Sequence, residues 1–160
     1  MNNSRVTTCL WFDKGGDEAA AFYLSVFAES RRLRHLDSPV DTPSGLAGER
    51  LTVEFELDGQ RFMILNGGPH FTLSPAVSIV VNCDSQDEVD YFWDRLVDGG
   101  QPSQCGWLVD RFGVSWQIIP NRLIELMTDP DPAVAQRVAE SMMQMVKIEI
   151  PTLEAAASGP

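Results

Sequence analysis

Two carboxylates, Glu54 and Glu56, alternate along the sequence with the apolar residues Val53, Phe55 and Leu57. Successive side chains of a β-strand point to opposite faces, so both glutamates share one face and the apolar residues share the other. If the apolar residues pack under a helix, the carboxylates line the concave side of a sheet, where such a pair can do acid–base chemistry. The alternative is an ordinary polar strand face.

Two further residues belong to the next strand. Arg61 lies two positions before Met63, which places both side chains on one face, and an arginine there can pair with an anionic group. Trp11 shares a face with Thr7 and Cys9 and is expected to line the same concave surface. These residues favour a ligand-binding surface.

Other reactive residue types have plainer interpretations. Arg31, Arg32 and Arg34 precede His35, a cluster that either holds an anion or marks a solvated edge strand. Cys105 precedes a glycine, with no base close in sequence, which favours an inert thiol over a reactive one.

Composition narrows the class of protein. The 160 residues carry a net charge of −11, which disfavours binding to nucleic acids. No apolar run reaches the roughly 20 residues of a membrane span, and the first residues contain no stretch suited to a secretory signal. The 3 cysteines form no CxxC pair, which predicts a reducing compartment and a cytoplasmic protein with free thiols.

The candidate residues must be positioned by strands and helices. Asp17 and Ser85 are predicted to cap helices, the second in a capping box with Glu88, and Asp58-Gly59 is a hairpin signal. Alternation and β-forming residues predict strands over 6–12, 50–57, 60–66 and 76–82, and a pair within 105–120 around the turn 110–113.

This order of elements occurs twice. The segment DEAAAFY (17–23) aligns with DEVDYFW (87–93), which also pairs the preceding strands as Thr8 with Ser78 and Leu10 with Val80. The two hairpins align Gly59 with Gly113, and the residues that follow them correspond as Phe62 with Trp116 and Ile64 with Ile118. The sequence therefore predicts an internal repeat, with Trp116 packed beneath a helix.

The chain changes character after Pro120. Residues 121–127 are predicted to be helical or irregular, Asp131-Pro132 starts a helix, VKIEI (146–150) alternates like a strand, and the tail 155–160 is expected to fray. The helix carries Val134, Val138 and Met142 in one stripe. This excess of apolar surface predicts a homodimer that buries it.

Four segments, CLWFDKGGDEAAAFYLSVF, DGQRFMILNGGPHF, CGWLVDRFGVSWQIIP and MMQMVKIEIPTLEAA, carry a family resemblance. The chain resembles the PhnB-like branch, labelled demethylubiquinone methyltransferase, of the vicinal oxygen chelate (glyoxalase/bleomycin resistance) superfamily. The resemblance implies an α+β fold of two βαβββ modules with a C-terminal helical extension. A single domain is expected over 5–150, with modules at about 5–67 and 75–120 and the extension at 121–155.

The superfamily's metal positions carry over to Thr7, Val77, Met63 and Gln117. Hard divalent ions prefer imidazole or carboxylate ligands, and only Gln117 among these offers a suitable donor, so no metal is expected. The methyltransferase label implies a methyl donor held on a Rossmann-like sheet, but Gly15-Gly16 is not its Gly-rich turn and the order of strands and helices differs. No cofactor is therefore expected.

These observations predict a metal-free protein that binds a small organic ligand on the concave side of its sheets. The expected ligand-binding residues are Trp11, Glu54, Arg61, Met63, Trp107 and Gln117. Two alternatives stay open, because fold alone does not separate them. One is an enzyme, either a metal-dependent lyase or dioxygenase or the labelled methyltransferase. The other is a non-catalytic resistance protein that sequesters a compound.

Overall fold

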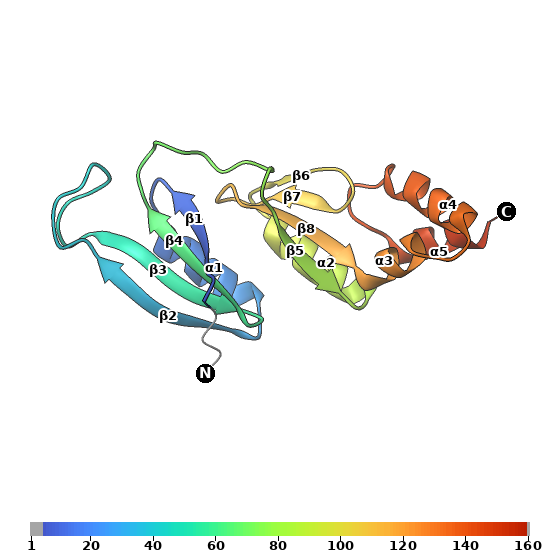
Figure 1. Cartoon of the computed structure of the whole chain (residues 1–160), viewed down its shortest axis with the longest axis horizontal. Helices are drawn as coiled ribbons and strands as arrows, with labels where there is room; N and C mark the ends of the chain where they lie inside the picture. Colours follow the sequence, from blue (N-terminus) through green and yellow to red (C-terminus); the bar gives the residue numbers. More distant parts are fainter. Residues whose placement is uncertain (1–4, 160) are drawn as a thin grey trace. The chain divides into compact units, whose positions relative to one another are not determined.

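A computed structural model describes residues 5–159 and divides the chain into two compact units, Met1–Leu73 and Ser74–Pro160. The first unit has the order β1 (Thr8–Phe12), α1 (Gly16–Val26), β2 (Ser30–Asp37), β3 (Arg50–Leu57) and β4 (Gln60–Asn66) (Figure 1). Its sheet has the strand order β1-β4-β3-β2. The β1–β4 pair is parallel and the other pairs are antiparallel, as one βαβββ module requires.

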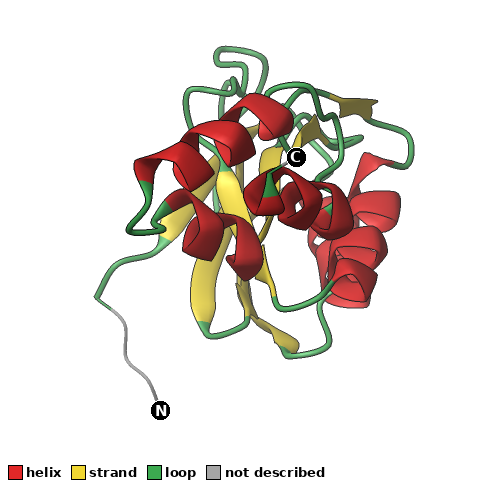
Figure 2. Cartoon of the chain, turned by 90° about the vertical axis from the view of Figure 1, so that its right-hand side faces the viewer, coloured by secondary structure: helices red, strands yellow, loops and turns green. Residues whose placement is uncertain are grey.

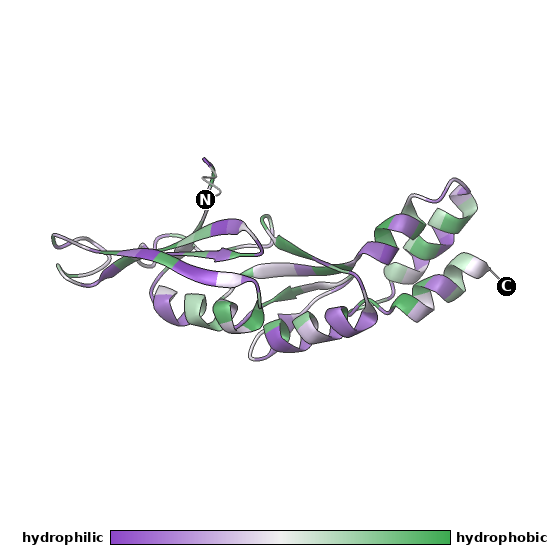
Figure 3. Cartoon of the chain, turned by 90° about the horizontal axis from the view of Figure 1, so that it is seen from below, coloured by the Kyte–Doolittle hydropathy of each residue, from purple (hydrophilic) through white to green (hydrophobic). Residues whose placement is uncertain are grey.

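Helix α1 covers one face of this sheet (Figure 3). The predicted alternation in β3 is confirmed, because Val53, Phe55 and Leu57 are buried. Phe55 stacks between Tyr23 of the helix and Phe62 of β4, with ring centroids 6.0 and 5.6 Å apart. The intervening glutamates of β3 therefore belong to the face turned away from α1.

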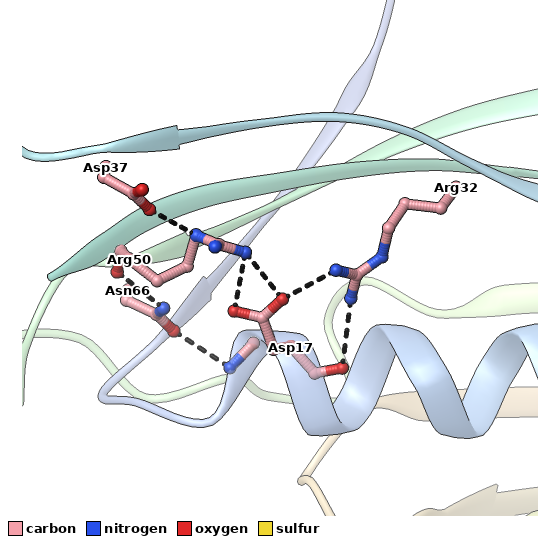
Figure 4. A network of polar contacts seen from close by, with 6 residues as sticks. Asp17, Arg32, Asp37, Arg50 and Asn66 are labelled. Atoms are coloured by element: carbon pink, nitrogen blue, oxygen red, sulfur yellow. Dashed lines mark hydrogen bonds and ion pairs between the residues drawn. The ribbon is translucent and has the colours of Figure 1, made fainter.

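The predicted cap of this helix is wrong. Gly15, with a φ of +82°, is the N-cap instead of Asp17, and the Gly16 N–H donates to Asn66 Oδ1 at 3.0 Å. The side chain of Asp17 accepts from Arg32 and Arg50 instead (Figure 4). A left-handed glycine turn starts the helix two residues earlier than a cap at Asp17 would.

The second unit repeats the path with β5 (Ile79–Cys83), α2 (Gln86–Val97), β6 (Gln101–Pro102), β7 (Trp107–Val109) and β8 (Ser115–Pro120). Its strand order is β5-β8-β7-β6, with β5 and β8 parallel. The predicted cap of α2 is confirmed, since Glu88 N–H donates to Ser85 Oγ at 3.2 Å. Trp116 is fully buried, and β8 packs against α2, as expected.

Strand pairing fixes which residues of the two modules are equivalent. Thr8 pairs with Phe62, and Ile79 pairs with Trp116, so Leu10 corresponds to Val81. The predicted match of Leu10 with Val80 is therefore wrong by one residue: Leu10 and Val81 are buried, whereas Val80 is 48% exposed. The cause is that the second connection between strand and helix is one residue shorter than the first.

The two hairpins also differ. Leu57 pairs with Gln60 around the predicted two-residue turn Asp58-Gly59. In the second module Val109 pairs with Ser115, so residues 110–114 form the turn. Counted from the paired strands, Glu54 then corresponds to Trp107 and Met63 to Gln117, because each is the partner of the other in its own hairpin.

Three helices, α3 (Asn121–Met127), α4 (Pro132–Met142) and α5 (Ile150–Ser158), complete the second unit (Figures 1 and 2). Asp131 caps α4 as predicted. The helices bury a cluster of their own, which consists of Ile119, Leu123, Leu126, Val138, Met145, Ile148 and Leu153. Val134 and Met142 pack partly against this cluster.

Two expectations for this segment are wrong. Residues 146–150 are not a strand, and residues 155–158 of the tail are not frayed, because α5 extends to Ser158. Pro160 lies outside the described residues. The alternating Val146 and Ile148 follow an irregular path, in which Ile148 is fully buried. The apolar stripe of α4 is thus used within the chain and no longer argues for a dimer. None of the helices in the described residues is long and apolar enough to cross a membrane.

Candidate functional site

A buried carboxylate lies between two arginines on the first sheet. Glu54 is 7% exposed, although its residue type is usually found at the surface. Arg34 Nε donates to Glu54 Oε1 at 2.7 Å, and Arg61 Nη2 donates to Glu54 Oε2 at 2.9 Å. Each carboxylate oxygen therefore accepts a charge-assisted hydrogen bond from a different strand.

Strand register explains this cluster. Glu56 pairs with Arg61 across the β3–β4 hairpin, so Arg61 lies diagonal to Glu54 on the same face. The ladder between β2 and β3 is irregular between Arg32 and His35, and Arg34 falls within that irregular stretch. Such an irregularity changes the direction of a side chain, and here it accompanies the contact of Arg34 with Glu54.

The second glutamate of the predicted pair is also bound. Arg31 contacts Glu56 at 3.0 Å, and both residues lie on the face that carries Glu54. Glu54 and Glu56 thus share one face as predicted. Because arginines contact both carboxylates, the glutamates serve as ion-pair partners, and the arrangement does not favour acid–base chemistry.

Arg61 has an unused donor. Its side chain is 21% exposed, and its Nε atom is buried without a hydrogen-bond partner among the described residues. A buried N–H without an acceptor costs about 1–3 kcal/mol, and charged donors cost more. An acceptor supplied by a ligand would remove that cost.

Two sulfur-containing side chains lie on the same face of the first sheet, next to Arg61 and Glu54. Cys9 pairs with Met63 across the β1–β4 ladder, which makes the two sulfur-bearing residues neighbours. Burial raises the pKa of the Cys9 thiol, so its nucleophilic thiolate form is scarce at neutral pH. Cys9, Cys83 and Cys105 are free thiols, and burial raises the pKa of Cys83 to about 12.

Trp11 is held firmly at the edge of this face. Its Nε1–H donates to Gly68 O at 2.9 Å, and its ring meets Phe71 edge-on at 4.9 Å between centroids. A Cβ at Gly67 would lie 2.4 Å from the indole, so only glycine leaves room for the ring there. The structure thus brings Trp11, Glu54, Arg61 and Met63 together on one sheet.

Trp107 and Gln117 lie on the second sheet and pair with each other across β7 and β8. Gln117 Nε2 donates to Ser78 Oγ at 2.8 Å. Ser115, two residues before Gln117, is 3% exposed, and its Oγ has no hydrogen-bond partner among the described residues. Sequence reasoning did not single out Ser115, although the alternation of β8 places it on the face of Gln117. It named Arg34 only as part of the arginine cluster before His35, not as a partner of Glu54.

The donor set does not fit a hard divalent ion. Thr7 and Val77 are exposed, Met63 offers only a thioether, and Gln117 is engaged with Ser78. Among residues 5–159, no group of three or more His, Cys, Asp or Glu side chains is arranged to hold a metal. The residues at the superfamily's metal positions therefore do not fit a divalent metal.

The described residues also do not form a recognisable binding site for the methyl donor that the methyltransferase label implies. Both described sheets mix parallel and antiparallel pairs, in contrast to the doubly wound parallel sheet of Rossmann-like folds. Gly15-Gly16 leads into α1, but the Gly16 N–H donates to Asn66 instead of facing a phosphate site. The turn at Gly15-Gly16 thus has a structural role, which is to start α1 and bond it to Asn66 of β4.

Three solved structures are similar to this chain. A PhnB protein from Bacillus cereus is 31% identical, with a TM-score of 0.65, over 73% of this chain and 99% of its own. A protein from Pseudomonas aeruginosa is 20% identical, with a TM-score of 0.61, over 74% and 98%. The fosfomycin resistance protein FosX from Listeria monocytogenes is 17% identical, with a TM-score of 0.57, over 81% and 100%.

A comparison with curated proteins finds no match. The family described as 3-demethylubiquinone-9 3-methyltransferase matches residues 4–119, which comprise both modules and leave out α3, α4 and α5. PhnB proteins and FosX are members of the vicinal oxygen chelate superfamily, and the two βαβββ modules agree with that fold. The chain therefore belongs to the 3-demethylubiquinone-9 3-methyltransferase family, on the PhnB-like branch of the vicinal oxygen chelate superfamily.

Proposed function

We propose that the protein binds a small organic molecule with an anionic group on the face of the first sheet turned away from α1, without a metal. The observation that carries this proposal is the buried Nε of Arg61, which has no hydrogen-bond partner within residues 5–159 and lies beside the Glu54 carboxylate. A carboxylate or phosphonate oxygen of the ligand would accept from this donor, which gives a hydrogen bond between two charged groups that a neutral ligand cannot form.

The surroundings of Arg61 suit an anion with an apolar body. The face carries three arginines, namely Arg31, Arg34 and Arg61, against the two glutamates that they contact. It is therefore locally positive on a chain whose net charge is −11. Met63 and Trp11 supply apolar surface for the rest of the ligand, and Glu54 holds the Arg61 guanidinium in place.

Binding without turnover is favoured over catalysis because both glutamates are held by arginines. One FosX structure was solved with Mn(II) and 1S,2S-dihydroxypropylphosphonic acid, and that FosX chain is 16% identical to this one. The alternative is an enzyme, either a metal-dependent lyase or dioxygenase or the methyltransferase of the family label. The metal-dependent enzyme would require ligands that Thr7, Val77 and Met63 do not offer.

The test measures binding of small organic anions to the full chain by calorimetry, with EDTA present. The probes are benzoate, nicotinate and propylphosphonate. Wild type should bind at least one of them, and Arg61→Lys should bind it about tenfold more weakly. Lysine keeps a positive charge beside Glu54 but lacks the Nε donor, and a bond to a charged group contributes about 1.5–3 kcal/mol.

Arg122→Lys is the matched control, because Arg122 pairs with Glu125 and Glu154 among the C-terminal helices. It should bind the anion like wild type. Equal binding by Arg61→Lys would overturn the proposed site. Binding that appears only after Mn²⁺ replaces EDTA would favour the metalloenzyme instead.

Two further expectations remain predictions. A homodimer is still expected because members of the superfamily that this chain resembles commonly pair, and light scattering should report about twice the 17.7 kDa chain mass. A cytoplasmic location rests on the sequence pattern of the cysteines. Neither affects the anion site, which lies within the first unit.

A further inference from the structure

Ser115 is a buried polar side chain that the fold does not use. It is 3% exposed, and its Oγ has no hydrogen-bond partner among the described residues. Leaving a buried hydroxyl unpaired costs about 1–3 kcal/mol, so a serine that serves packing alone would be better replaced by alanine. The hydroxyl is therefore suited to a partner that is not part of the chain.

Ser115 belongs to an uncharged group of hydrogen-bonding side chains. Strand alternation places it on the face of Gln117, opposite the buried Trp116 and Ile118. Gln117 donates to Ser78 Oγ, which leaves the Ser78 hydroxyl proton available to an acceptor. The positions that share this face of the paired strands β5, β7 and β8 also include Val80, Trp107 and Val109.

The repeat supports a role in binding. Ser115 and Arg61 occupy equivalent positions in their modules. Ser115 lies two residues before Gln117, which pairs with Trp107, and Arg61 lies two residues before Met63, which pairs with Glu54. The two buried side-chain atoms without a partner in the described chain, Arg61 Nε and Ser115 Oγ, thus fall at equivalent places. One position offers a charged donor and the other a neutral hydroxyl.

We infer that the second sheet holds a separate subsite for an uncharged, oxygen-bearing planar group, such as a carboxamide on a ring. Ser115 Oγ and the Ser78 hydroxyl donate to the carbonyl oxygen of that group, Gln117 faces its polar edge, and the Trp107 ring stacks on its plane. A charged group is disfavoured because the face provides no countercharge to offset its desolvation. The inference goes beyond the proposed function, because it assigns ligand chemistry to Trp107 and Gln117 of the second sheet, whereas the anion site lies on the first.

The test uses nicotinamide and nicotinate, which share a ring and differ in charge. Each is titrated into the full, ¹⁵N-labelled chain while the Trp107 indole and Gln117 side-chain amide signals are followed by NMR. Nicotinamide should shift both signals, and nicotinate should shift them less than a fifth as much at equal concentration. Ser115→Ala should weaken nicotinamide binding about fivefold, the value of one neutral hydrogen bond of about 1 kcal/mol.

A second readout separates binding from packing. Ser115→Ala should keep or raise the unfolding midpoint, because it removes an unpaired hydroxyl. Ser103→Ala, at an exposed serine of the same unit, is the control and should bind nicotinamide like wild type. Unchanged nicotinamide binding by Ser115→Ala would overturn the inference, as would equal shifts from the two probes.

The two proposals fail in different ways. Arg61→Lys should weaken binding of the organic anions and leave nicotinamide binding unchanged. If an anion binds through Arg61 but nicotinamide does not bind, the uncharged subsite is wrong and the proposed function stands. If neither the anions nor nicotinamide binds, both proposals are overturned.

Discussion

The two modules follow the same chain path but treat equivalent positions in opposite ways. The first sheet places Glu54 and Arg61 where the second places Trp107 and Ser115. On the helix side both sheets are apolar, with Phe62 and Trp116 at matching positions. Packing against a helix thus constrains one face in both modules, whereas the other face was free to change its charge.

The hairpins of the two modules also differ in the length of their turns. The first closes with the two-residue turn Asp58-Gly59, and glycine supplies the positive φ that such a turn needs. The second is longer and is organised by one side chain, since Asp110 accepts from the N–H groups of Phe112 and Val114. Asp110 also accepts from Trp116 Nε1 at 2.8 Å, which ties the turn to the core.

The largest effect is expected from removing this organiser. Asp110→Ala deletes three hydrogen bonds and leaves the buried Trp116 N–H without its carboxylate acceptor. Each bond to a charged group contributes about 1.5–3 kcal/mol, and their contributions overlap, so we expect a loss of about 4 kcal/mol. Urea denaturation of the full chain measures it.

Asp98→Asn is the control, because this carboxylate pairs with Arg111 but is 74% exposed. It should lower the free energy of unfolding by less than about 1 kcal/mol. If Asp110→Ala were as mild as this control, the second hairpin would be held by its strands alone. The contrast between the two turns would then have no energetic basis.

A medium effect is expected where the C-terminal helices join the second module. Gly106 has a φ of +82°, and a Cβ there would lie 2.8 Å from Ile118 O and 3.0 Å from Ile148 Cγ1. Val146 O accepts from the Gly106 N–H at 2.7 Å, so the backbone cannot move away without losing this bond. Gly106→Ala should therefore destabilise the protein by about 2–3 kcal/mol.

Gly59 and Gly113 provide the comparison for that variant. Both have a positive φ, and a Cβ at either would meet nothing within 4 Å. Gly59→Ala and Gly113→Ala should each cost about 1 kcal/mol, from backbone strain alone. Equal losses for all three alanine variants, measured by thermal unfolding, would show that close contact at Gly106 contributes nothing.

Sequence patterns predicted most of the fold because alternation and turn residues act locally. The strands Arg50–Leu57 and Gln60–Asn66 have the expected bounds, and the capping box at Ser85 is present. The prediction of a strand over 146–150 was wrong because its alternating pattern suits a strand, whereas Ile148 packs into the cluster of the C-terminal helices and Val146 is exposed. A short alternating pattern does not reveal which element will cover it.

For the candidate site, the sequence predicted which face of the sheet its residues occupy but not all of their contacts. Alternation placed Glu54 and Arg61 on the sheet surface turned away from the helix, but not the arginine that completes the cluster. Arg34 contacts Glu54 from an irregular stretch of β2, and a sequence gives little sign of such irregularities. Ser115 could not be identified from the sequence, because a hydroxyl without a hydrogen-bond partner is recognised only when its burial and its neighbours are known.

The smallest effect concerns how each helix is tied to its surroundings. Asp17 of α1 contacts Arg32 and Arg50 within the first sheet (Figure 4), whereas Asp90 of α2 pairs with Lys147 in the segment that follows α4. Hydrogen bonds from Lys147 and Gln86 lower the pKa of Asp90. The pair with Asp90 raises the pKa of Lys147.

The signs of these shifts define the pH window of the Asp90–Lys147 pair. A lowered carboxyl pKa contributes stability that is complete above the unfolded value of about 3.9 and lost as the pH falls through the folded value. A raised lysine pKa contributes stability that is complete below about 10.4 and lost as the pH rises through the folded value. The pair is thus at full strength between these limits.

Lys147→Met should therefore lower the free energy of unfolding by about 0.5 kcal/mol at pH 7, because the Asp90 side chain is 42% exposed and solvent screens the pair. The difference from wild type should shrink as the pH falls below about 3.9 through the folded pKa of Asp90, and again as it rises above about 10.4 through the folded pKa of Lys147. Lys14→Met, at an exposed lysine before α1, is the matched control and should show no such window. Urea titrations across this pH range measure both variants, and a difference that stays constant from pH 3 to pH 11 would mean that Lys147 acts through the packing of its aliphatic stem instead of its charge.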